Sequence, residues 1–123
     1  MSSIIDIKYF KNYVDLEISN FKTSLLDKEL YSRNILNRAY YTSFLHCRDL
    51  LGLSNSLSGS IHRDVIEGIK NNTVKNKLTK LLRYRKDADY KNYYLNKSIT
   101  DLLDAQRTMN YILTLTKIDL DKI

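Results

Sequence analysis

The chain has 123 residues, 43% of them apolar, with three glycines and no proline. This length fits one domain, and the apolar content is enough to build a core, so general disorder is excluded. The scarcity of glycine and proline indicates a helical protein with few sharp turns. The net charge of +6 favours a polyanionic partner such as RNA.

Apolar residues recur at spacings of three and four along the first 51 residues, which predicts two amphipathic helices. The first is expected over residues 4–26, begun by a capping box of Ser3 and Asp6. The second is expected over residues 29–51, where Gly52 provides a left-handed stop. Their predicted buried faces are Ile7, Phe10, Val14, Ile18, Phe21 and Leu25, then Leu36, Ala39, Tyr40, Ser43, Phe44, Cys47, Leu50 and Leu51.

A loop and two further helices are expected in the middle of the chain. The loop covers residues 53–59, which are rich in serine and glycine, and a short helix follows over residues 60–71. Thr73 is then expected to cap a longer helix. This helix is expected to end between Arg85 and Asp89.

The last third of the chain predicts one more helix. Residues 90–97 show no helical period and are interpreted as an aromatic linker. Ser98 and Asp101 form a second capping box, which predicts a helix over residues 99–116. Residues 117–123 are expected to fray.

Together these patterns predict an all-α protein with one domain over residues 1–123, an up-and-down bundle of four to five helices. Cys47 is the only cysteine, which excludes an internal disulfide and fits a small core residue. One Cys and two His do not make a structural zinc site, and no glycine-rich phosphate loop is present, so neither a metal nor another cofactor is expected. The sequence lacks a signal peptide and a long apolar run, which predicts a cytoplasmic protein without a membrane segment.

Arg85 interrupts the apolar face of the helix that precedes residue 90. A hydrated cation in line with leucines is costly unless it is paired or used. Asp89 follows four residues later and is within reach of Arg85 on a helix. The two residues form either an ion pair that closes the helix or part of a polar site. The apolar face consists of Val74, Leu78, Leu81 and Leu82.

The candidate catalytic residues lie in the most basic part of the chain, where nine Lys or Arg and four Asp or Glu lie between His62 and Lys91. Arg85 can clamp a phosphate with its planar guanidinium group, and His62 can move a proton near neutral pH. Asp89 can orient Arg85. The simpler alternatives are a solvated charged face, a packing histidine and tyrosines that only fill the linker.

The candidate RNA contacts combine cations with rings that can stack on bases. They are Arg38, Tyr41, Lys86, Lys91 and Tyr93, with Tyr90 also among the catalytic candidates.

The order and spacing of several short motifs resemble those of HEPN domains, over roughly residues 30–112. The resemblance is to the small stand-alone subgroup with an Arg-Ala-Tyr-Tyr run and an Arg-x-x-Ala-Asp-Tyr motif. The residues that carry it are Asn37-Arg38-Ala39-Tyr40-Tyr41-Thr42-Ser43-Phe44, Leu50-Leu51-Gly52, His62, and Arg85-Lys86-Asp87-Ala88-Asp89-Tyr90.

The resemblance implies a helical bundle that is usually a homodimer. Many HEPN domains are metal-independent ribonucleases of toxin–antitoxin and antiphage systems. Their motif is Arg, four to six residues, then His, and two copies meet across the dimer. Toxin members often pair with a small nucleotidyltransferase antitoxin. The resemblance therefore implies that Arg85 steadies an RNA phosphate.

The chain departs from this motif at its second position. Tyr90 follows Arg85 after four intervening residues, where the ribonuclease motif has His. An ordinary tyrosine titrates near pH 10 and is a poor base at neutral pH. Three alternatives remain open: His62 takes the proton-transfer role, Tyr90 takes it, or the domain is a non-catalytic HEPN subunit that binds RNA, a nucleotide or a nucleotidyltransferase.

Overall fold

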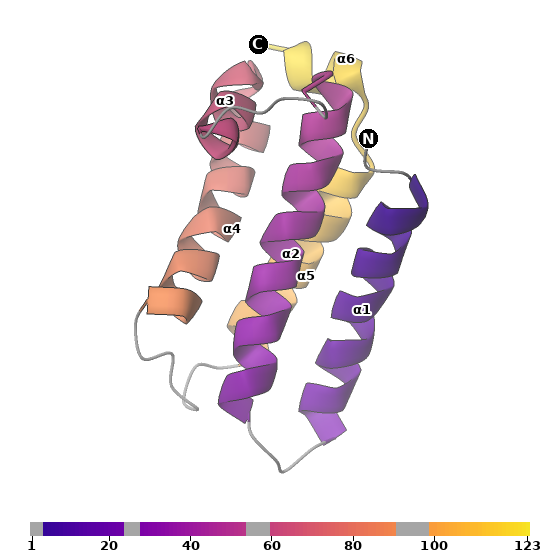
Figure 1. Ribbon diagram of the computed structural model, residues 1–123, viewed down its shortest axis with the longest axis vertical. Helices are drawn as coiled ribbons and strands as arrows, with labels where there is room; N and C mark the ends of the chain where they lie inside the picture. The colour runs from indigo at the N-terminus through magenta and orange to yellow at the C-terminus, as the bar shows by residue number, and fades with distance from the viewer. Residues whose placement is uncertain (1–3, 24–27, 54–59, 91–98) are drawn as a thin grey trace.

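The computed structural model describes residues 4–23, 28–53, 60–90 and 99–123, and within these ranges it contains six α-helices and no strand (Figure 1). The prediction of an all-α protein is confirmed, although the described residues hold one helix more than the expected four to five. The helices are α1 (Ile4–Thr23), α2 (Lys28–Leu50), α3 (Ile61–Gly68), α4 (Asn72–Tyr90), α5 (Ile99–Leu113) and α6 (Lys117–Asp121).

The central helix α2 packs against α1, α4 and α5, while the short helix α3 packs against α2 and α4 near one end (Figure 1). Ala39 and Ser43 on α2 are fully buried, and their small side chains allow close packing of neighbouring helices. Cys47 is also fully buried, as predicted, and this burial raises the pKa of its thiol to about 12.

The C-terminal end of α2 is set by local hydrogen bonds. Beyond Leu50, the N–H of Gly52 donates to Asp49 and the N–H of Leu53 donates to Arg48, a Schellman motif in which Gly52 takes a φ of 73°. The predicted stop at Gly52 is thus confirmed. The predicted capping residues Ser3 and Ser98 lie outside the described part of the chain.

The predicted cap of α4 is wrong by two residues. The side-chain Oδ1 of Asn71 accepts the N–H groups of Thr73 at 3.0 Å and Val74 at 3.3 Å. An N-cap oxygen bonds the N–H groups two and three positions later, so Asn71 is the capping residue and Thr73 lies inside the helix. The helix then continues to Tyr90, one residue beyond its predicted end.

The C-terminal segment does not fray as expected. The predicted fifth helix ends at Leu113, and Thr116 with Asp119 forms a capping box that starts α6. The carbonyl of Leu120 accepts the N–H groups of Lys70 at 2.9 Å and Asn71 at 3.0 Å. Its side chain is fully buried. The C-terminal segment therefore packs on the turn between α3 and α4 and accepts its backbone N–H groups.

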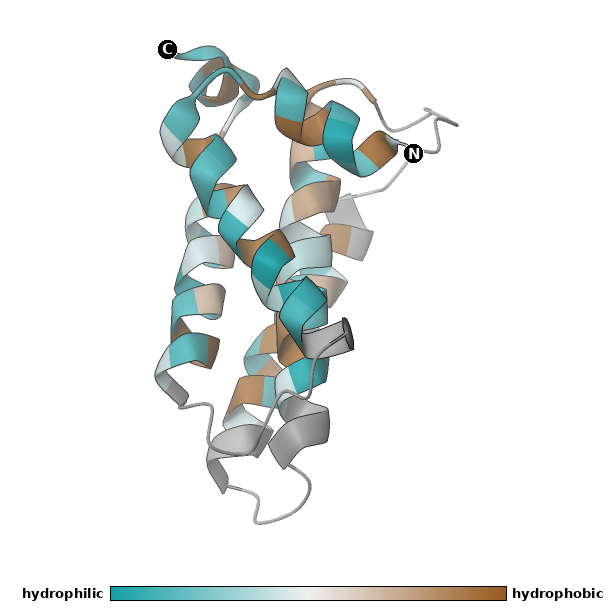
Figure 2. Cartoon of the chain, turned by 90° about the vertical axis from the view of Figure 1, so that its left-hand side faces the viewer, coloured by the Kyte–Doolittle hydropathy of each residue, from teal (hydrophilic) through white to brown (hydrophobic). Residues whose placement is uncertain are grey.

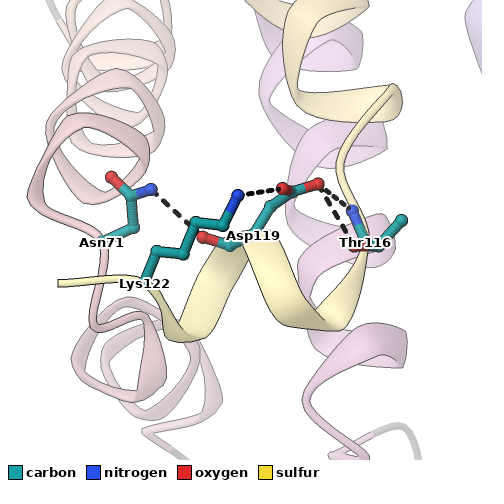
Figure 3. A network of polar contacts seen from close by, with 4 residues as sticks. All are labelled: Asn71, Thr116, Asp119 and Lys122. Carbon is teal, nitrogen blue, oxygen red and sulfur yellow. Dashed lines mark hydrogen bonds and ion pairs between the residues drawn. The ribbon is translucent and has the colours of Figure 1, made fainter.

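The polar contacts around Asp119 strengthen the same connection (Figure 3). Its Oδ2 accepts the backbone N–H of Thr116 at 2.8 Å, and its backbone carbonyl accepts the Asn71 side-chain amide at 3.1 Å. The C-terminal helix could not be predicted from the sequence pattern, because Leu120 is a single buried residue among charged neighbours. One buried residue does not make a helical period.

Helix α4 is held against α5 by one shared carboxylate. The Tyr84 hydroxyl donates to Asp104 Oδ2 at 2.9 Å, and the Lys80 ammonium group lies 2.9 Å from the same oxygen. These contacts fix the rotation of α4, whose outward surface is largely hydrophilic (Figure 2). None of the described helices has the length and apolar composition of a membrane-spanning segment.

We predict that Leu120→Ala lowers the free energy of unfolding by about 2–5 kcal/mol, because it removes a fully buried leucine. Urea denaturation followed by circular dichroism measures this change. The matched control is Ile118→Ala in the same helix, where the side chain is 71% exposed and a change within about 0.5 kcal/mol is expected. Equal losses in both variants would contradict the docking of α6.

Candidate functional site

A pocket of about 510 Å³ lies between α3 and α4. This volume is in the ~300–1,000 Å³ range of small-ligand sites. It gathers three cations and one histidine, because the first turns of α3 face the last turns of α4. Its lining consists of Ser60, His62, Arg63, Ile66, Glu67, Leu82, Arg85 and Lys86.

The central helix α2 fixes the imidazole of His62. The hydroxyl of Tyr40 lies 2.7 Å from His62 Nδ1, and the Phe44 ring stacks on the imidazole with centroids 4.4 Å apart and an interplanar angle of 26°. Tyr40 and Phe44 are four residues apart, so both lie on the same face of α2. The imidazole is thus held by one hydrogen bond and by ring contacts with both Phe44 and Tyr40, the latter with centroids 5.7 Å apart.

The pairing of Tyr40 with His62 decides what the second imidazole nitrogen can do. Burial raises the pKa of Tyr40, although the positive charge of Arg85 opposes this, so the phenol keeps its proton at neutral pH. If the hydroxyl donates to Nδ1, then Nε2 carries the proton and can only donate a hydrogen bond, because a neutral imidazole does not give up its N–H proton near pH 7. If Nδ1 carries the proton and donates to the hydroxyl, then Nε2 is an acceptor and can act as a base.

Arg85 lies close to this pair. Its guanidinium carbon is 5.7 Å from the centroid of the Tyr40 ring, a cation–π contact. The pKa of His62 is lowered, first by burial and then by the positive charges of Arg85 and Lys86. His62 is therefore a neutral imidazole at pH 7, in a pocket whose cations favour an anionic ligand.

The predicted site residues divide into three groups. The structure brings His62, Arg85 and Lys86 to this pocket. Arg38 and Tyr41 lie instead on the side of α2 that meets α1.

The third group comes from the end of α4 and beyond. Asp89 and Tyr90 belong to the last turn of α4, but their side chains lie outside the described residues, as do Lys91 and Tyr93. The pairing of Arg85 with Asp89 and the alternative role of Tyr90 thus stay predictions.

The residues that orient His62 were not among the predicted site residues. Tyr40 and Phe44 were assigned to the core, where they do lie, with Tyr40 fully buried and Phe44 3% exposed. A signal was present, because the phenol of a buried tyrosine needs a hydrogen-bond partner. The sequence did not reveal that this partner comes from α3.

A second pocket of about 550 Å³ lies between α1 and α5, with a mostly apolar lining. Two of its polar groups are engaged within the fold, whereas the buried Oδ1 of Asn110 has no hydrogen-bond partner among the described residues. Lys11 pairs with Asp15 at 2.8 Å, and His46 Nε2 donates to the Leu115 carbonyl at 3.0 Å. The groups suited to chemistry therefore gather in the pocket between α3 and α4.

No family model, no curated protein and no solved structure matches this chain in comparisons with known proteins. The resemblance to HEPN domains accordingly stays a prediction. Any function assigned to the chain has to come from its own residues.

We predict that an NMR titration of His62 gives a pKa below its ordinary value of about 6.5. Because the folded pKa is the lower one, the contribution of His62 to stability is complete above pH ~6.5 and decreases as the pH falls through the unfolded value toward the folded value. Arg85→Ala removes a nearby positive charge and raises the pKa of His62.

A His62→Gln variant identifies the resonance. Arg83→Ala serves as the control, since Arg83 is exposed and does not line the pocket. If Arg83→Ala and Arg85→Ala shift the pKa equally, the effect of Arg85 is not local.

Proposed function

We propose that this protein is a HEPN-type, metal-independent ribonuclease that works as a homodimer in a toxin–antitoxin or antiphage system. One observation carries the proposal: a neutral His62, oriented by Tyr40, shares a pocket with Arg85 and Lys86. A proton-transfer group beside two cations is what cleavage of an RNA phosphodiester requires.

In the proposed reaction, the RNA 2′-oxygen bonds to the adjacent phosphorus and the bond to the 5′-oxygen breaks. The 2′-hydroxyl gives up its proton, and the leaving 5′-oxygen takes one. His62 Nε2 accepts the proton of the 2′-hydroxyl, in the tautomer in which Nδ1 donates to the Tyr40 hydroxyl, and a group of the second copy gives a proton to the 5′-oxygen. Arg85 and Lys86 stabilise the charge that develops on the phosphate oxygens.

The charge of the pocket lining supports a polyanionic ligand. Three cationic side chains, Arg63, Arg85 and Lys86, face a single carboxylate, Glu67. Cations gathered in a pocket attract phosphate groups and raise the rate of encounter with RNA.

One observation favours a second candidate, a non-catalytic HEPN subunit that binds RNA, a nucleotide or a nucleotidyltransferase antitoxin. The motif position that holds His in the ribonucleases is Tyr90 here. A pocket with a single histidine has one group for two proton transfers unless another residue or a second copy contributes. Binding without cleavage would then be its activity.

We predict that the purified protein cuts single-stranded RNA in the presence of EDTA and that Arg85→Ala lowers the rate at least about a hundredfold, because it removes a charge that stabilises the transition state. The matched control is Arg83→Ala, which removes the same charge two residues away, outside the pocket. Full activity of Arg85→Ala, or cutting that EDTA abolishes, would overturn the proposed mechanism.

His62→Ala tests the proton-transfer role in the same assay. The expected loss is about 10²–10⁴-fold, the usual contribution of acid–base catalysis. Normal cutting by this variant would remove His62 from the mechanism and leave Tyr90 as the candidate. RNA binding without cutting in the wild type would support the non-catalytic alternative.

We further predict that light scattering gives the mass of two chains at micromolar concentration. In the proposed homodimer, the second copy supplies the additional catalytic group to a shared groove. Mixing Arg85→Ala chains with His62→Ala chains would then restore part of the activity, because the shared groove receives the intact His62 of one chain and the intact Arg85 of the other. A monomer with full activity would contradict the shared site.

A further inference from the structure

A cluster of aromatic rings and one arginine lies where α1 meets α2. We name it the aromatic–arginine face, and it consists of Tyr9, Phe10, Tyr13, Arg38 and Tyr41. The guanidinium carbon of Arg38 lies 5.6 Å from the Phe10 ring centroid and 5.5 Å from that of Tyr13. Edge-to-face contacts join Tyr9 to Phe10 at 5.8 Å and Phe10 to Tyr41 at 6.0 Å.

Several of these groups are open to solvent. Tyr9 is 66% exposed and Tyr41 is 36% exposed, and Arg38 is exposed as well. Contacts among the rings hold them in place, so the face presents aromatic surface at little further cost in side-chain entropy. Rings of this kind, interleaved with a planar cation, form the stacking platforms of proteins that bind single-stranded nucleic acid.

The charge of Arg38 adds to this argument. Within the described residues, Arg38 contacts two rings and forms no ion pair with a carboxylate. Among the residues that the structure describes, no acidic neighbour therefore neutralises its positive charge. An arginine in this setting can contact a phosphate while its plane stays on the rings.

Two ring contacts through the buried Phe44 connect the aromatic–arginine face with the pocket between α3 and α4. The Tyr41 ring lies 6.1 Å from that of Phe44, and Phe44 lies 4.4 Å from the imidazole of His62. Both tyrosines of the Tyr40–Tyr41 pair sit on α2, which lies between α4 and α1 (Figure 1). Tyr40 points to His62 and Tyr41 to α1, so adjacent residues connect the pocket with the face.

This separation suits a single strand of RNA. Two ring contacts separate Tyr41 from His62, which is the distance of a few nucleotides when bases are stacked ~3.4 Å apart. A strand that places its phosphate at Arg85 would therefore bring a base a few nucleotides further along over α2 toward Tyr41.

We propose that Tyr41, supported by Arg38, forms a base-stacking subsite for the single-stranded RNA engaged at Arg85. This inference rests on the proposed function, because it takes the pocket as the place where the phosphate binds. Stacking makes no base-specific hydrogen bond, so the subsite accepts every base and favours purines, whose ring area is larger.

The test compares two labelled oligomers of equal length by fluorescence anisotropy. One is a single-stranded RNA and the other is its abasic counterpart, both methylated on the 2′-hydroxyls so that neither can be cut. Tyr41→Ala is expected to weaken binding of the base-bearing RNA about tenfold, the effect of losing one stacked base, and to leave binding of the abasic strand unchanged. Tyr41→Phe keeps the ring and is expected to bind like the wild type.

Tyr111→Ala is the matched control. Tyr111 is a comparable 42% exposed and carries Lys77 over its ring at 5.1 Å, but it lies on α5. No change in affinity is expected. If Tyr111→Ala weakens binding as much as Tyr41→Ala, or if Tyr41→Ala affects both oligomers equally, the stacking subsite is overturned.

Arg85→Ala separates this inference from the proposed function. A variant that binds both oligomers more weakly, beside an unaffected Tyr41→Ala, keeps the pocket and overturns the subsite. The reverse result keeps the subsite and overturns the phosphate role of Arg85. A Tyr41→Ala protein that becomes monomeric in light scattering would show that the face joins two chains, which also overturns the stacking role.

Discussion

The phenol of Tyr40 imposes the constraint on which the site depends. Its ring is fully buried on α2, so the hydroxyl is removed from water and needs a partner. The partner is Nδ1 of His62, at 2.7 Å. An unpaired phenol at this position would cost about 1–3 kcal/mol. Burial of one ring on α2 thus specifies where α3 lies and how its histidine is turned.

Helix α3 has only eight residues, too few to be stable by itself in water. Its position depends on contacts with its neighbours. Gly68 permits one of them, because a Cβ at this position would lie 3.1 Å from Leu51 Cδ1. The C-terminal segment provides another, through the carbonyl of Leu120 at the turn that follows α3. Residues of the site are therefore placed by parts of the chain distant in sequence.

Features that depend on residues close together in the chain were mostly predicted from the sequence, and features that depend on distant residues were not. Helical periods identified the buried faces of α2 and α4, because those faces depend on spacing alone; Leu78 and Leu81 are fully buried as expected. The cap of α4 was assigned wrongly because Asn71 and Thr73 are both capping residue types, and the local pattern did not decide between them. The C-terminal helix was missed because Leu120 acts through tertiary contacts that no local pattern contains. Likewise, Arg38 and Tyr41 were predicted to contact RNA from their side-chain chemistry, whereas the rings that α1 adds beside them depend on how the helices pack.

The connection between Asn71 and Asp119 joins groups 48 positions apart in the chain. Closing so long a loop costs conformational entropy before the contacts that it brings together can stabilise the fold. This connection is therefore expected to form late in folding. It can also open before the rest of the bundle does, because α6 has only five residues. Such local opening would release the turn between α3 and α4 while α1, α2 and α5 stay packed. The site is thus lost in a partly unfolded state that still has most of its helices, so loss of the helical circular dichroism signal on heating does not have to coincide with loss of the pocket.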